Sequence, residues 1–113
     1  MEKKVQLGWL FEFYGPLLTE HRREVMRLYC EEDLSLAEIA AEMGITRQGV
    51  HDAVSKSQTQ LEGYEQKLGL MGRYQRMMHM VETCKASLEK VVPAAGTEAH
   101  MQTALQLLDE MEP

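Results

Sequence analysis

The stretch Leu34–Val54, LSLAEIAAEMGITRQGVHDAV, constrains the fold of this chain more than any other segment. Ser35 followed three residues later by Glu38 is the capping-box pattern that begins a helix. Gly44 tolerates the left-handed backbone conformation of a tight turn, and Thr46 can cap a second helix. Two short capped helices joined by so tight a turn are typical of a helix-turn-helix unit.

The same stretch supplies residues that can hold two such helices together. Ala40 is small enough for the second helix to cross closely, and Ile45, directly after the turn glycine, can fill the gap between the helices. Val50 has the helical spacing expected of an inward residue on the second helix. We therefore expect Ala40, Gly44, Ile45 and Val50 to be the turn and packing residues of the unit.

The outward side of the second helix predicts a nucleic-acid interface. In helix-turn-helix proteins the residues near the start of this helix contact base edges in the major groove. Arg47 could pair with guanine and Gln48 with adenine. The helix expected before Leu34 offers arginines as phosphate anchors. The candidate contacts are Arg47, Gln48, His51, Asp52, Ser55 and Lys56, with Arg22, Arg23 and Arg27 as the anchors.

The composition predicts an all-α helical bundle, because Met, Leu, Ala, Glu and Gln are good helix formers and dominate the chain. We expect an N-terminal helix within residues 1–18, a helix-turn-helix core over 19–69 and a C-terminal extension of long helices over 70–113 that packs on the core. Pro93 is expected to end a helix that runs from about Leu70 to Val92, and Thr97 to cap the last helix. Lys85 interrupts the apolar stripe of the first of these long helices.

The chain is acidic, and this bears on the nucleic-acid prediction. Twelve Lys and Arg residues against 18 Asp and Glu residues give a formal charge of −6. Neutralised phosphates supply most of the affinity for nucleic acid, so an acidic chain must concentrate its positive charge on one face. We expect modest affinity unless dimerisation aligns the arginines.

Other sites are not indicated. The four histidines are scattered, and Cys30 and Cys84 lack the spacing of a metal or redox motif, so we expect no metal, no cofactor, reduced thiols and no enzymatic activity. No apolar run approaches the roughly 20 residues of a membrane-spanning helix. These features predict a cytoplasmic protein without membrane insertion.

The N-terminal segment carries the densest aromatic cluster of the chain. Trp9 and Phe13 are four residues apart and lie on a different helical face from Leu7, Leu10 and Tyr14. One small core cannot easily cover both faces, so we expect Trp9 and Phe13 to contribute to an interface, with a homodimer as the default assembly.

Four pieces of the sequence, YGPLLT, LYCEEDLSLAEIA, GITRQGVHD and LEGYEQKLGL, resemble the YlxM-like family of small bacterial helix-turn-helix proteins. The helix-turn-helix portion is also similar to the promoter-reading region four of sigma factors. The resemblance implies a bacterial, cytosolic regulatory protein with a link to the signal recognition particle pathway, and it brings no catalytic residues. Gly49 and His51 depart from it, because a better helix former and an aromatic residue are expected there.

Three functions remain open at this point. The first is a non-catalytic regulatory or accessory protein of the signal recognition particle pathway, which binds DNA, signal recognition particle RNA or the particle's proteins. The second is an acidic adaptor that binds a protein through its Met-rich helix, around Met77 and Met78, and does not read DNA. The third is a DNA-binding transcription regulator unrelated to secretion. Salt separates the first from the second, because only phosphate binding weakens steeply as salt rises.

Overall fold

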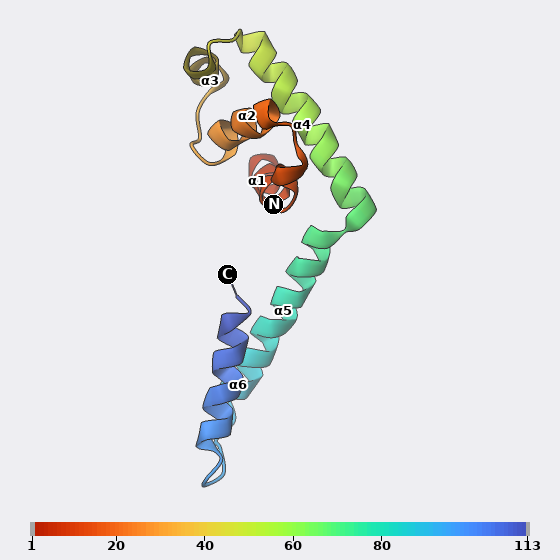
Figure 1. Cartoon of the computed structure of the whole chain (residues 1–113). Helices are drawn as coiled ribbons and strands as arrows, with labels where there is room; N and C mark the ends of the chain where they lie inside the picture. Colours follow the sequence, from red (N-terminus) through yellow and green to blue (C-terminus); the bar gives the residue numbers. More distant parts are fainter. Residues whose placement is uncertain (1, 113) are drawn as a thin grey trace. The chain divides into compact units, whose positions relative to one another are not determined.

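The computed structural model describes residues 2–112, and these residues form helices and no strand. The predicted all-α fold is therefore confirmed for this part of the chain. The helices, coloured along the chain in Figure 1, are α1 (Lys3–Tyr14), a 3-10 turn (Gly15–Leu17), α2 (Glu20–Cys30), α3 (Leu36–Met43), α4 (Arg47–Leu68), α5 (Leu70–Glu89) and α6 (Glu98–Glu110). Backbone contacts divide the chain into two compact units, and the boundary falls between Met71 and Gly72.

Side-chain caps fix where the helices of the first unit begin. Ser35 and Glu38 form a complete capping box at α3, in which the Glu38 N–H donates to Ser35 Oγ (3.1 Å) and the Ser35 N–H donates to Glu38 Oε1 (3.0 Å). The Thr46 hydroxyl accepts the Gly49 N–H at the start of α4 (2.9 Å). Gly44 (φ 68°) ends α3 in the left-handed conformation that glycine adopts without steric cost.

Two apolar clusters form the core of the first unit. In one, buried residues of α1 meet α2 and α4; in the other, α2, α3 and α4 pack together. Met26 and Leu61 belong to the first cluster, and Val25, Ile39 and Val50 to the second. Helix α4 thus contributes its N-terminal half to the helix-turn-helix cluster and its C-terminal half to the α1 cluster.

A buried hydrogen-bond network joins the end of α1 to the junction between α4 and α5. The Tyr14 hydroxyl donates to Glu65 Oε1 (2.5 Å) and accepts the Leu70 N–H (3.1 Å), while the same Glu65 oxygen accepts the Met71 N–H (3.0 Å). These contacts satisfy backbone N–H groups that the first turn of a helix otherwise leaves without partners. Burial, with the Glu65 hydrogen bond second, raises the pKa of Tyr14 above its ordinary value.

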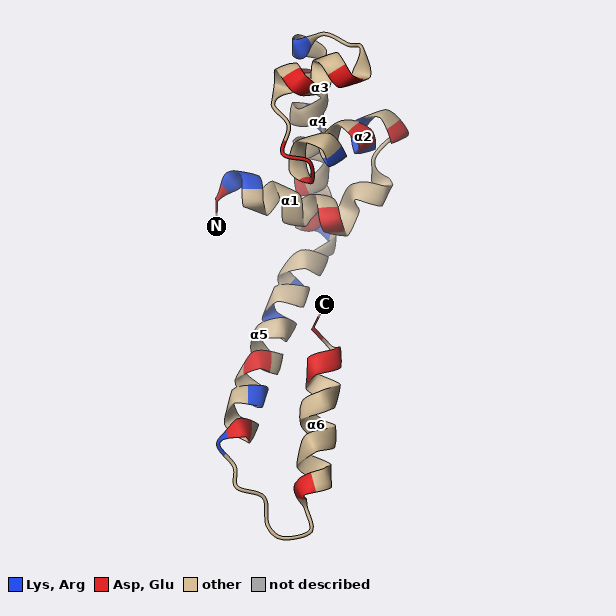
Figure 2. Ribbon diagram, turned by 90° about the vertical axis from the view of Figure 1, so that its left-hand side faces the viewer, with Lys and Arg blue, Asp and Glu red and all other residues tan. Residues whose placement is uncertain are grey.

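In the second unit, α6 lies antiparallel to α5, and one lysine bridges them (Figures 1 and 2). Lys85 forms ion pairs with Asp109 and, at 3.5 Å, with Glu112. The residue that interrupts the apolar stripe of α5 is therefore an interhelical contact. Its carboxylate partners, Asp109 first, raise the pKa of Lys85.

Two details of the second unit differ from the sequence prediction. Helix α5 ends at Glu89 rather than Val92, because the residue before Pro93 disfavours the helical conformation and the chain leaves the helix earlier. Thr97 precedes α6, but its side chain does not cap the helix: its hydroxyl donates to the Ala94 carbonyl (2.5 Å).

Candidate nucleic-acid interface

The first three turns of α4 present six predicted contact residues to solvent. Opposite them, Val50, Ala53 and Ser57 are buried against the rest of the unit. The 3.6-residue repeat thus separates a buried apolar side of α4 from an exposed polar side. The exposed residues are Arg47, Gln48, His51, Asp52, Ser55 and Lys56.

A carboxylate lies in the middle of this surface. Asp52 Oδ1 accepts a hydrogen bond from the Gln48 side-chain amide (3.1 Å), and His51 Nδ1 is 3.8 Å from the same oxygen. This contact uses one of the two N–H donors of the Gln48 amide. The negative charge of Asp52 also opposes the approach of a phosphate.

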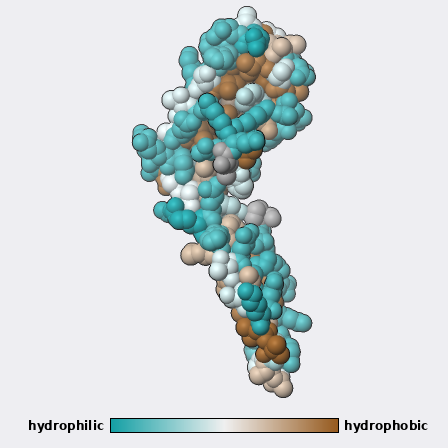
Figure 3. All heavy atoms as spheres, turned by 180° about the vertical axis from the view of Figure 1, so that it is seen from behind, coloured by the Kyte–Doolittle hydropathy of each residue, from teal (hydrophilic) through white to brown (hydrophobic). Residues whose placement is uncertain are grey.

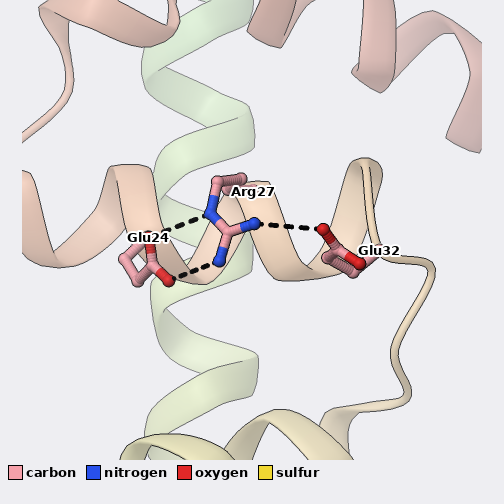
Figure 4. A network of polar contacts seen from close by, with 3 residues as sticks. All are labelled: Glu24, Arg27 and Glu32. Atoms are coloured by element: carbon pink, nitrogen blue, oxygen red, sulfur yellow. Dashed lines mark hydrogen bonds and ion pairs between the residues drawn. The ribbon is translucent and has the colours of Figure 1, made fainter.

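The three predicted phosphate anchors on α2 have different surroundings. Arg27 lies between two carboxylates, as Figure 4 shows: it donates to both Glu24 oxygens (2.8 and 3.1 Å) and to Glu32 Oε1 (3.2 Å). These hydrogen bonds raise the pKa of Arg27 and, through the same contact, lower the pKa of Glu24. Its charge is locally compensated, which makes it a weaker anchor than its sequence position indicates.

Arg23 and Arg22 donate elsewhere. Arg23 Nη2 donates to the Pro16 carbonyl (3.2 Å), which holds it toward the turn after α1. Arg22 Nη1 donates to Gln60 Oε1 on α4 (3.1 Å). Of the three, Arg22 is therefore the arginine that hydrogen-bonds α4.

Arg22 lines an open groove between α2 and α4 that includes two residues the sequence analysis did not single out. The groove has a volume of ≈ 480 Å³, and Thr59 and Gln60 are the additional residues. They lie four residues after Ser55 and Lys56, so helical spacing could have placed them on this side of α4. The lining residues are Arg22, Ser55, Lys56, Thr59 and Gln60.

Gly49 lies directly over the cap of α4. A Cβ atom at this position would be 3.1 Å from Thr46 Oγ1, the atom that accepts the Gly49 N–H. That distance is tighter than most van der Waals contacts. Glycine leaves room for the cap, at a cost in helix propensity of about 1 kcal/mol against alanine.

The turn residues lie at the crossing of α3 and α4. The Gly44 and Ile45 N–H groups both donate to the Ala40 carbonyl, the latter at 3.1 Å. Ala40 and Ile45 are partly buried and pack against the cluster that contains Val50. The backbone of the turn and its apolar side chains thus fix the start of α4 relative to α3.

The predicted interface residues Trp9 and Phe13 are stacked along α1. Their ring centroids are 6.4 Å apart and their planes differ by 25°. Phe13 is partly buried against the α1 cluster, whereas Trp9 is 36% exposed and lines a shallow surface with Val5, Gly8 and Glu12.

The first unit carries charges of both signs (Figure 2), and α3, with the sequence LAEIAAEM, has two acidic residues and no basic one. Among the residues that the structure describes, no group of three or more His, Cys, Asp or Glu side chains could hold a metal ion. Over the same residues, no helix is both long and apolar enough to cross a membrane.

A capped helix, a glycine turn and a second helix with an exposed polar side define a helix-turn-helix protein. Residues 1–98 match the family model UPF0122, described as "Putative helix-turn-helix protein, YlxM / p13 like", and the chain belongs to that family. It is 39% identical over 99 residues to a UPF0122 protein of Symbiobacterium thermophilum, which covers 88% of this chain and 92% of the relative. A UPF0122 protein of Halalkalibacterium halodurans is 34% identical over 112 residues, 99% of each chain, and one of Bacillus cereus is 41% identical over 109 residues, 96% of this chain and 99% of the relative.

Proposed function

We propose that this protein is a non-catalytic regulatory or accessory protein that binds nucleic acid through the exposed side of α4. The observation that carries the proposal is the row of six polar side chains on the first three turns of that helix, opposite a buried apolar side. The helix-turn-helix packing holds this row outward, where such proteins contact base edges. The role in the signal recognition particle pathway, in the cytoplasm, rests on the family resemblance alone.

Weak rather than tight binding fits the charges described above. Asp52 lies within the contact surface, and Arg27 is compensated by Glu24 and Glu32. Few positive charges are left to neutralise phosphates, so affinity should start from a modest value and fall with salt at a slope set by that small number of phosphate contacts. A homodimer through α1 would double the number of α4 helices that meet one nucleic acid.

The test is a fluorescence anisotropy titration of the whole protein against random duplex DNA and against signal recognition particle RNA, at low and near-physiological salt. Arg47→Ala is expected to weaken binding about tenfold, because it removes a charged contact at the start of α4. Arg73→Ala, an exposed arginine of α5, is the matched control and should leave binding unchanged. Absence of binding to both polymers at low salt would contradict the proposal.

A second candidate function is a protein adaptor, and the exposed apolar side chains of the second unit favour it. Met77, Met80 and Leu107 are 38%, 64% and 57% exposed. Hydrophobic atoms also gather near the lower tip of this unit in Figure 3. Methionine repacks around varied partners, and the particle's own proteins are candidates. An adaptor would bind in a nearly salt-insensitive manner and lose affinity in Met77→Gln rather than in Arg47→Ala. A transcription regulator unrelated to secretion would instead select a defined duplex with two half-sites.

A further inference from the structure

We propose that the groove between α2 and α4 binds one phosphodiester of the nucleic-acid backbone, with Arg22 and Lys56 as its two cations. This inference rests on the proposed function and adds a specific site to it. Arg22 comes from α2, and the other four lining residues come from α4. These four follow Arg22 by 33 to 38 positions in the sequence. Folding alone brings the two cations to the same groove.

Arg22 is held in place by a relay of hydrogen bonds. Gln60 Oε1 accepts from Arg22 Nη1 (3.1 Å), and Gln60 Nε2 donates to the Tyr64 hydroxyl (2.8 Å). The Tyr64 ring in turn lies 5.9 Å, centroid to centroid, from the buried ring of Tyr14. A guanidinium has five N–H donors, and the contact with Gln60 uses one of them. Gln60 therefore positions Arg22 at low entropic cost and leaves it able to grip an anion.

The chemistry of the lining fits a singly charged phosphate group. Arg22 and Lys56 supply positive charge, and the Ser55 hydroxyl can donate to a phosphate oxygen. The Thr59 hydroxyl already donates to the Ser55 carbonyl (3.1 Å), so Thr59 shapes the wall rather than binding the ligand. The groove is open to solvent, as a site for a continuous backbone must be.

The position of the groove along α4 matches the dimensions of a duplex. Lys56 follows Gln48 by eight residues, which is about 12 Å along a helix. The major groove of DNA is about 12 Å wide. With Arg47 and Gln48 at base edges, the groove would lie where the helix reaches the flanking backbone. Arg22, which α2 places beside this part of α4, would contact the same stretch of backbone.

The test compares two double variants that remove the same charge. Arg22→Gln/Lys56→Gln is expected to weaken binding to duplex DNA or signal recognition particle RNA and to reduce the slope of log affinity against log salt by about one. Arg73→Gln/Arg76→Gln, which removes two exposed arginines of α5, should leave that slope unchanged. Gln60→Glu, which introduces a carboxylate next to Arg22, should weaken binding as the first double variant does. Thermal melts establish that each variant is folded.

A second measurement reads the site directly and separates failure of the groove from failure of the proposed function. On addition of nucleic acid, the Arg22 guanidinium and Gln60 amide signals in NMR spectra of the whole protein should shift. If the wild-type protein binds but these signals and the slope do not change, the groove is overturned and the role of α4 stands.

Inorganic phosphate tests the alternative that the groove binds a free phosphate ion rather than the phosphate of a nucleic-acid backbone. Saturable shifts of the same signals with inorganic phosphate, without any binding of nucleic acid, would overturn both the backbone assignment and the proposed function. The expected result is the reverse: phosphate competes only at concentrations far above those at which the nucleic acid binds.

Discussion

Tyr14 shows how much a single hydroxyl can contribute to this fold. It is 1% exposed, donates to Glu65 and accepts from the first N–H of α5. Tyr14→Phe keeps the ring but leaves the Leu70 N–H and Glu65 without this partner, which should cost about 1–3 kcal/mol of unfolding free energy. Urea melts measure it, and Tyr29→Phe, which keeps the ring that Lys4 contacts, should cost less than about 0.5 kcal/mol. Equal costs for the two variants would contradict this account of Tyr14.

Asp52 is the residue whose removal should improve nucleic-acid binding. Asp52→Asn keeps an acceptor for the Gln48 amide but deletes a negative charge from the middle of the contact surface. We expect about two- to fivefold tighter binding at low salt and a smaller gain at high salt, because the repulsion is screened. Anisotropy titrations measure the change, with Glu110→Gln on α6 as the control for net charge. An equal gain in that control would assign the effect to overall charge.

The two cysteines should differ in reactivity. Cys30 is half-buried, and burial raises its pKa to about 11, with Lys4 opposing and Glu31 adding to the shift. Cys84 is exposed. Since the thiolate is the reactive form, Ellman's reagent at neutral pH should label Cys84 rapidly and Cys30 only after denaturation. Labelling of Cys84→Ser and of Cys30→Ser separately shows which cysteine reacts rapidly and which only after denaturation. Rapid labelling of Cys84→Ser would contradict the burial of Cys30.

At the scale of elements, α3 depends on its capping box and should therefore lose stability in acid. The Ser35 N–H and hydroxyl lower the pKa of Glu38 below its ordinary value of 4.5. A carboxyl with a lowered folded-state pKa stabilises the fold above its ordinary pKa, and this contribution disappears as pH falls through the folded-state value. The stability difference between the wild type and Glu38→Gln should accordingly be larger at pH 7 than at pH 3. Denaturant melts at both values measure it, and Glu42→Gln on the same helix corrects for general charge effects.

The helices that the sequence predicted best are those fixed by neighbouring residues. Ser35 with Glu38, Gly44 and Thr46 act within four residues of their partners, so the bounds of α3 and the start of α4 could be predicted. The contact between Arg22 and Gln60 spans 38 positions, and that between Tyr14 and Glu65 spans 51. No periodicity encodes such pairs, because they depend on how the helices cross.

The same distinction explains the candidate site. Helical spacing placed six residues of α4 on one exposed side, since one turn determines the next. Helical spacing could also have paired Arg27 with Glu24, three residues before it. It could not show that Arg22 would reach Gln60 on α4. Which of three nearby arginines serves the site is decided by tertiary contacts.

At the scale of the whole molecule, assembly through α1 is the prediction that most affects function. Trp9→Glu places a charge on the partly exposed apolar face and should convert a dimer to the 12.9 kDa chain. Sedimentation equilibrium measures the mass, and Met80→Glu, an equally drastic change on exposed α5, should leave it unaltered. A wild-type protein that sediments as a single chain would remove the dimer from the proposal.

Helix α4 has a consequence for how the first unit melts. It is 22 residues long, about 33 Å, and its two halves belong to different apolar clusters. Because α4 is one continuous helix, the two clusters should unfold together unless the helix frays from one end. Amide protons of α4 deep in each cluster, at Val50 and Leu61, should therefore exchange with solvent through the same global opening. The N-terminal half of α4 and the α1 cluster should then unfold together, so that a destabilising change near Tyr14 lowers the population of folded α4 without contacting its exposed polar side.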